Sequence, residues 1–370
     1  MEYCSRAGID PLKNNIPTGQ SNFLLACWAV SLISGDNILG LNIKSSTVKG
    51  YMKAAAKLYV RAELPDPFDN KNVTVNYPEI IITALSKYES KPDRKEPVTD
   101  SMFLYIAEQA RASRQDSMLA ALKDWFAWSR YGGPRRAEWC QTTMTKYQTV
   151  EHGPPNEAAA FRLDDITFYT KRGLRIDPNN ISALSIVHHA KVRWRYQKNE
   201  DNGEEITYYL DVSNPEWCPC LSLWNIVQRA LRLRIPSHEP IAQYRNDKNV
   251  RVYITDKNVN DTLQKAASKV LGIKDTNVLR KWTTHSLRVT AANELHRRNF
   301  SGEFIKKRLR WRSDAFLGYL RNTIHIARTH TLAMQLSSIN LNTEKEEASG
   351  IVIYDRPEED KLLWNLSEYV

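Results

Sequence analysis

Apolar residues recur at helical spacing in the first part of the chain. The run 23–34 is apolar and stops at Gly35, and glycine commonly follows the last turn of a helix. A second helix is expected from Ser45, with Ser45 or Ser46 as its cap. Its apolar positions recur at steps of three and four: Val48, Tyr51, Met52, Ala55, Leu58 and Ala62. A further helix near 78–88 leads into the polar stretch 89–97. We therefore expect residues 1–96 to form a helical domain that ends in a linker.

The pattern changes after residue 97. Helices are expected from Thr99 and over 117–129, and the second of these breaks at the Gly-Gly-Pro of 132–134. Segments 166–170, 184–188, 192–196 and 206–210 are rich in β-branched and aromatic residues, which indicates strands. The last two flank a polar turn with Asn-Gly at its end, a β-hairpin signal. Helices are then expected over 221–233, 258–271, 285–298, 302–309 and 314–336. The prediction is a mainly α fold with a small antiparallel β-sheet.

Length and composition support two folded domains. The chain has 370 residues, more than one ordinary core accommodates, and 42% of them are hydrophobic. We place the second domain at 97–342 and an acidic C-terminal tail at 343–370. The tail holds eight acidic and three basic residues, so its charge is −5 and the rest of the chain carries +15. A basic body favours a polyanion partner, most commonly nucleic acid, although a merely basic protein would look the same.

One helix face of the first domain is a candidate for contact with that partner. Lys49, Lys53 and Lys57 lie four residues apart, away from the apolar face. Such a strip can follow a phosphate backbone. The alternative is an ordinary solvated helix face.

The cysteines and apolar runs limit the location of the protein. Five cysteines with irregular spacing imply no disulfide framework and fit a reducing compartment. No secretory signal is recognisable, and the run 23–33 is too short to span a bilayer, so we expect an intracellular protein with no membrane partner. Cys218-Pro219-Cys220, with His188, His189 and His238, are residue types that can bind zinc. The Cys pair is closer than usual and no second pair follows, so we expect no metal and favour packing at a strand-to-helix junction.

The residues with recognisable chemistry lie near the C-terminus of the second domain. His285 and Arg288 lie three apart on one helix face, where together they can hold a phosphate oxygen. Trp311 and then Tyr319 follow. In this order the residues resemble the closing signature of the tyrosine recombinase (phage integrase) family. The segment Arg-Trp-Arg-Ser-Asp-Ala-Phe at 310–316 looks especially like eukaryotic and mobile-element members, such as those of Crypton- and DIRS-type transposons.

Two earlier positions extend the resemblance. The family has an Arg after a Gly-containing turn, with an acidic residue three positions on, and Arg135 and Glu138 match it better than Arg136 does. The family also has a Lys in a hairpin turn, where Lys198 stands and Lys191 is the alternative. The resemblance covers about residues 99–336. The N-terminal helices resemble the family's core-binding domain more loosely.

The resemblance implies cleavage and rejoining of DNA through a tyrosine. Tyr319 would attack a phosphodiester and form a 3′-phosphotyrosyl link. A free tyrosine hydroxyl has a pKa of about 10, so a tyrosine nucleophile needs a base or positive charge nearby, and His285 is the candidate for the proton. Lys198 would protonate the leaving 5′ oxygen. The link keeps the energy of the broken bond, so neither ATP, a metal nor another cofactor is implied.

Four further residues receive supporting roles from the resemblance. Arg135 and Arg288 would hold the two non-bridging oxygens, where charge grows. Trp311 would add a hydrogen bond and packing, although it stands where His is more frequent. Glu138 would orient Arg135. The gap from Trp311 to Tyr319 is one residue shorter than expected for the family, and a tighter turn would be needed to absorb the difference.

The implied partners are double-stranded DNA and further copies of the chain. The resemblance implies a homo-tetramer on two DNA sites, with the apolar segment 324–336 passed to a neighbouring subunit. It also implies a nuclear location if the host is eukaryotic. Two alternatives remain open: a DNA-relaxing enzyme similar to type IB topoisomerases, and a catalytically inactive, domesticated DNA-binding protein.

Overall fold

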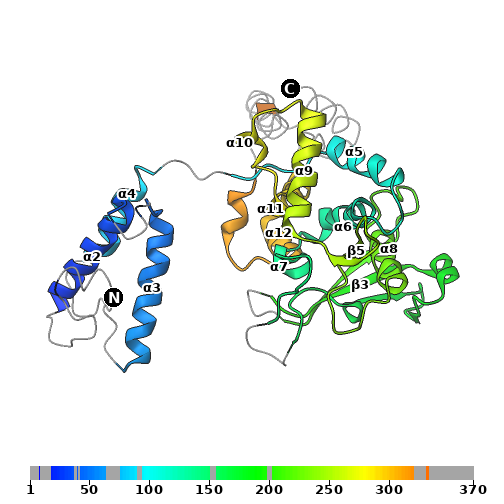
Figure 1. The fold of residues 1–370 in the computed structure, drawn as a ribbon, viewed down its shortest axis with the longest axis horizontal. Coiled ribbons are helices and arrows are strands. Elements are labelled where there is room, and N and C mark those ends of the chain that lie inside the picture. The colour runs from blue at the N-terminus through cyan, green and yellow to red at the C-terminus, as the bar shows by residue number, and fades with distance from the viewer. Residues whose placement is uncertain are drawn as a thin grey trace, which may run out of the picture. The chain divides into compact units, whose positions relative to one another are not determined.

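The chain divides into two compact units, Met1–Pro92 and Asp93–Val370, in a computed structural model (Figure 1). The structure describes residues 8, 18–36, 40, 42–63, 76–89, 94–150, 156–197, 202–320 and 331–332. The division falls inside the polar stretch 89–97 that the sequence indicated as a linker. The acidic tail 343–370 and most of the segment 324–336 lie outside the described residues.

The described part of the first unit consists of α2 (Thr18–Ser34), α3 (Ser45–Arg61) and α4 (Tyr77–Ser86). Its small core is formed by Ala29 and Leu32 of α2, Val48 and Met52 of α3, and Ile82 of α4. Of the apolar positions that the 3.6-residue period selects on α3, Val48 and Met52 are buried, but Tyr51 and Leu58 are exposed. Ala56, which the prediction did not select, is buried.

The predicted cap of α3 is wrong. Lys44 is the N-cap residue and makes no side-chain cap bond. Ser45 instead donates from both its backbone N–H and its hydroxyl to the carboxylate of Glu89. A side chain from beyond α4 thus satisfies the start of α3, in place of a local cap.

The second unit contains most of the helices. They are α5 (Asp100–Arg111), α6 (Met118–Gly132), α7 (Arg136–Trp139), α8 (Pro219–Arg232), α9 (Asp256–Leu271), α10 (Thr276–Leu279), α11 (Thr284–Arg297) and α12 (Gly302–Leu309). Helix α6 is central, because it packs against α5, α8 and α11 (Figure 1). It begins at Ser117, whose hydroxyl accepts from the N–H of Ala120, and ends at Gly133 with φ +50°. A side chain at Gly133 would lie 3.1 Å from Leu309, so glycine allows α12 to approach closely.

A four-stranded antiparallel sheet covers part of this core, in the order β2-β1-β3-β4. Its strands are β1 (Ile166–Tyr169), β2 (Arg175–Ile176), β3 (His189–Trp194) and β4 (Glu204–Tyr209). A separate pair, β5 (Gln243–Arg245) and β6 (Arg251–Tyr253), is also antiparallel. Alternate residues of β3 are buried, and its last one, Trp194, stacks on Trp128 with ring centroids 5.7 Å apart. The predicted mainly α fold with a small antiparallel sheet is confirmed.

One predicted element is wrong, and the described start of another differs from the prediction. The expected strand at 184–188 lies mostly in a 3-10 helix, η3 (Ile181–Ile186), whose ends Ile181 and Ile186 are exposed. A short apolar run does not distinguish strand from helix, and pairing with β1 and β4 begins only at His189. The helix expected from residue 314 starts as a 3-10 turn, η4 (Asp314–Gly318). Within the described part of the chain, none of the helices has the length and apolar character that crossing a membrane requires.

Candidate active site

Segments far apart in the sequence meet beside the N-terminal half of α11. They are the turn after α6, the end of α12, η4 and α11 itself. The side chains that meet there are those of Arg135, Glu138, His285, Arg288, Arg310, Trp311 and Tyr319. All the catalytic residues that the sequence indicated and that the structure describes lie in this cluster, which we call the arginine pocket.

Arg288 is the most buried of the predicted residues, with 3% of its surface exposed. Its Nη1 donates to the carbonyl of Gly133 at 2.6 Å, and its Nη2 donates to the carbonyl of Leu309 at 2.7 Å. The guanidinium carbon lies 4.2 Å from the centre of the Trp311 ring. Burial, together with the charges of Arg310 and Arg135, lowers the pKa of Arg288 to about 9. A buried cation under this repulsion is stabilised by an anion.

Arg135 stands at the N-cap of α7, and Glu138 faces it from the third position of that helix. The Glu138 carboxylate accepts from the Arg135 backbone N–H at 2.6 Å and from its guanidinium at 3.0 Å. Glu138 therefore fixes both the backbone and the side chain of Arg135, in line with the orienting role that the resemblance implied.

Arg310 is a site residue that the sequence analysis did not assign. It ends α12 in the left-handed region at φ 58°, and its guanidinium lies 3.1 Å from the centre of the Trp194 ring. Its Nη2 is 3.3 Å from Glu138, and its carbonyl accepts from Arg135 at 3.2 Å. The segment 308–312 holds three arginines. The left-handed backbone at the middle one turns it inward, and no sequence periodicity signals that conformation.

The charges of the arginine pocket do not balance within it. Arg135, Arg288 and Arg310 contribute three positive charges, and Glu138 contributes one negative charge to this group. Burial also lowers the pKa of Arg310, while the carboxylate of Glu138 raises it. The remaining positive charge suits an oxyanion with several oxygens, such as a phosphodiester.

Tyr319 lies at the edge of this pocket. Its ring centroid is 4.9 Å from that of His285 in an edge-to-face arrangement, and 5.4 Å from that of Trp311. Its N–H donates to the carbonyl of Phe316 at 2.8 Å, closing the turn that follows η4. A 3-10 turn advances about 2.0 Å per residue, against about 1.5 Å for an α-helix. Residues 314–318 therefore cover a greater length along the helix axis than they would in an α-helix.

His285 is positioned at the start of α11. Its backbone N–H donates to the Thr283 hydroxyl, which caps the helix. Burial lowers the pKa of His285, and the charges of Arg288 and Lys95 lower it further. The imidazole is therefore neutral at pH 7 and able to accept a proton. Lys95, which the sequence analysis did not single out, lies before α5 and donates to the carbonyl of Arg280 at 3.1 Å.

Lys198 lies outside the described residues, and the nearest described residues on either side of it are Gln197 and Asn202. The Gln197 N–H donates to Asn202 Oδ1 at 2.7 Å across the hairpin turn. Residues 202–204 share a polar cavity of about 550 Å³ with Lys306, Lys307, Arg310 and Trp311. The base of the hairpin is thus next to the arginine pocket. The alternative lysine, Lys191, is 3.6 Å from Glu205 of the neighbouring strand.

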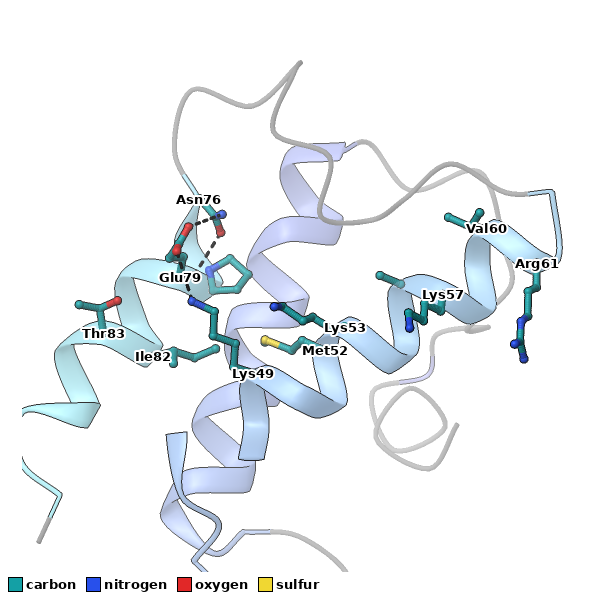
Figure 2. Close-up of a pocket in the computed structure, with 12 residues that line it drawn as sticks. Lys49, Met52, Lys53, Lys57, Val60, Arg61, Asn76, Glu79, Ile82 and Thr83 are labelled. Atoms are coloured by element: carbon teal, nitrogen blue, oxygen red, sulfur yellow. Dashed lines mark hydrogen bonds and ion pairs between the residues drawn. The ribbon is translucent and has the colours of Figure 1, made fainter. Parts of the chain in front are cut away.

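The three lysines proposed for DNA contact are exposed along α3. Lys49, Lys53 and Lys57 line a groove of about 660 Å³ between α3 and α4, whose apolar lining includes Met52 and Ile82 (Figure 2). Lys49 extends toward Glu79 of α4, with 3.6 Å between Nζ and the carboxylate. The groove gives this surface a basic wall beside an apolar floor.

The Cys218-Pro-Cys220 segment follows β4 and forms the start of α8, with Cys218 as the N-cap residue. The Cys218 sulfur accepts from the N–H of Leu221 at 3.3 Å and so caps α8. Burial raises the pKa of the Cys220 thiol to about 12, which disfavours the thiolate that metals bind. Among the described residues, no three His, Cys, Asp or Glu side chains are grouped as ligands for a metal ion.

The chain is distantly similar in structure to known proteins, and its sequence matches none of the families or curated proteins compared. Three solved structures of the Tn1549 transposon integrase in complex with DNA are similar. The complex with transposon right end DNA has a TM-score of 0.43 at 11% identity and covers 84% of each chain. Two complexes with circular intermediate DNA have TM-scores of 0.41 and 0.38, at 10% and 11% identity, and cover 84% to 86% of either chain. At these values the similarity assigns no role to any residue.

Proposed function

We propose that this protein is a tyrosine recombinase of mobile-element type, which cleaves and rejoins double-stranded DNA through a covalent bond to Tyr319. The observation that carries the proposal is the position of the Tyr319 ring, against His285 and Trp311, at the edge of a pocket with three guanidinium groups. A nucleophile, a neutral acceptor for its proton and an excess of fixed positive charge are the groups that phosphodiester cleavage by a phenol requires.

The proposed reaction follows from these positions. His285 takes the phenol proton as the Tyr319 oxygen attacks phosphorus, and Arg135 and Arg288 stabilise the charge on the non-bridging oxygens. Trp311 supports Arg288 from the face of its ring. The 5′ oxygen leaves with a proton that we assign to Lys198, because residues 202–204, which follow it closely in the sequence, line a cavity together with Arg310 and Trp311. A 5′ hydroxyl of a second strand then attacks the phosphotyrosine and regenerates the phenol, so the step needs no cofactor.

We further propose that the first unit is the core-binding domain and that Lys49, Lys53 and Lys57 contact the DNA backbone. The strand exchange implied by the resemblance involves a homo-tetramer on two sites, and the segment 324–336 is the proposed link between subunits. If the host is eukaryotic, the enzyme acts in the nucleus.

Covalent trapping tests the activity. A nicked suicide substrate, from which the 5′ segment diffuses away after cleavage, should accumulate a protein–DNA adduct with the wild-type chain and none with Tyr319→Phe. Because the target sequence is unknown, a library of duplexes enriched for binding supplies the substrate. Equal DNA binding by both proteins with no adduct from either would refute the enzyme and leave a DNA-binding protein. Relaxation of plasmid DNA without exchange between paired sites would instead indicate a topoisomerase-like activity.

A further inference from the structure

The carbonyl of Tyr319 accepts a hydrogen bond from a side chain on α11. The Nδ2 of Asn293 donates to this carbonyl at 2.8 Å across 26 residues of sequence. The same nitrogen donates to the carbonyl of Val289, one turn earlier in α11, also at 2.8 Å. Asn293 is 5% exposed. One N–H thus fixes the carboxamide to its own helix, and the other holds the segment that carries the proposed nucleophile.

From this contact we infer that Asn293 is the positioning residue for the nucleophile, and that it holds Tyr319 in the arginine pocket of its own chain, so that cleavage occurs in cis. The inference rests on the proposed function, and it adds a residue and a mode of delivery that the sequence analysis did not contain.

The geometry of α11 explains how one bond directs the phenol. His285 and Asn293 are eight residues apart, which is about 12 Å along a helix. The Tyr319 backbone is held at Asn293 while its ring contacts His285. The side chain therefore runs back along α11 toward the end of the helix that carries His285 and Arg288. A shift of the carbonyl away from Asn293 would draw the phenol along this axis and out of reach of the phosphate.

Apolar packing around Tyr319 holds its segment against α11 without fixing the position of the segment along the helix. Phe316, Leu309 and Ile305 form a small buried cluster with Ala291 and Ala292 of α11, and Tyr319 packs at its edge. Such contacts are non-directional, so they tolerate a slide of the chain that a hydrogen bond between fixed atoms does not. Asn293 is therefore suited to set the position of the attacking oxygen.

The test compares single-turnover adduct formation on a pre-bound suicide substrate. Asn293→Asp keeps the size of the side chain but places a carboxylate against two carbonyls, and we expect a rate at least about 100-fold lower. Asn293→Leu keeps the volume without a donor and should lose about tenfold, the effect of one buried hydrogen bond. DNA affinity should remain within about twofold for both, because the Asn293 side chain is buried and bonds to two backbone carbonyls. Asn277→Asp, on the exposed surface of α10, makes the same chemical change elsewhere and should react at the wild-type rate.

A substrate with a 5′ bridging sulfur separates positioning from proton donation. A thiolate leaves without a proton, so this substrate should restore cleavage to Lys198→Ala but not to the Asn293 variants. Restoration of the Asn293 variants, or wild-type rates from both of them on the ordinary substrate, would overturn the positioning role while leaving the proposed function intact. An equal loss of DNA affinity and cleavage would show a structural role alone.

Mixing two inactive chains tests delivery in cis. Tyr319→Phe keeps the arginine pocket without the nucleophile, and Arg288→Ala keeps the nucleophile with a damaged pocket. If delivery is in cis, their mixture forms no adduct; an adduct would show delivery in trans. The wild-type chain is the reference throughout, because its failure to form any adduct would refute the proposed function and this inference together.

Discussion

The balance of charge in the arginine pocket depends on Glu138, and Glu138→Gln tests it. The carboxylate contacts the guanidinium of Arg135 at 3.0 Å and that of Arg310 at 3.3 Å. The substitution keeps an oxygen that can accept from the Arg135 backbone N–H. It removes the negative charge from a group that then holds three guanidinium ions and no carboxylate.

The substitution should destabilise the fold, because the ion pair of Glu138 with Arg310 is buried. The side chains of Glu138 and Arg310 are 7% and 1% exposed. Removing one partner of a buried ion pair destabilises a protein by about 3–5 kcal/mol. Because the hydrogen bond to the Arg135 backbone is kept, we expect a loss of stability of about 3 kcal/mol, at the lower end of this range. For a domain of this size, that loss lowers the Tm by about 6–12 °C. The same excess charge should strengthen the binding of an oxyanion, so inorganic phosphate should raise the Tm of the variant more than that of the wild type.

Thermal unfolding of the full chain, with and without phosphate, measures both effects. Glu205→Gln is the matched control. Glu205 forms an ion pair with Lys191, and the side chains of Glu205 and Lys191 are 49% and 36% exposed. Exposed pairs contribute at most about 1 kcal/mol, so this control should change little. If Glu138→Gln unfolds at the wild-type temperature, or if phosphate stabilises it no better than the wild type, the charge imbalance that we assign to the pocket is wrong.

Two further predictions concern DNA binding and pH. Replacing Lys49, Lys53 and Lys57 by Gln should reduce the slope of log affinity for DNA against log salt concentration by up to about 2.7, at about 0.9 per phosphate contact. An unchanged slope would show that α3 does not contact the DNA backbone. The pKa of His285 lies below its ordinary value of 6.5, so on lowering the pH the imidazole stays neutral to below that value. The rate of adduct formation should therefore fall only below pH 6.5, and His285→Gln should be slower and lack this acidic limb; a limb that persists in the variant would assign it to another group.

The sequence by itself determined the elements whose signals are local. The apolar period of α3, the glycines after α6 and the polar turn between β3 and β4 depend on residues within one or two turns of each other, so their patterns can be recognised without the fold. Glu138 and Arg135 are three residues apart, so the sequence also brought these two together before the structure did. His285, Arg288, Trp311 and Tyr319 span 35 positions of the chain, and resemblance to a family signature, not local periodicity, indicated them.

Only the tertiary structure decided which other residues belong to the pocket. Arg310 contacts Glu138 across 172 residues of sequence. It does so because Arg310, the residue that follows α12, adopts a left-handed backbone and its guanidinium packs on Trp194 of β3. Asn293 meets Tyr319 because the turn after η4 brings the chain back over α11. At 314–318 a 3-10 turn stands where the start of an α-helix was expected. Such contacts depend on how segments pack, and hydrophobic periodicity encodes the face that an element buries but not the partner that lies against it.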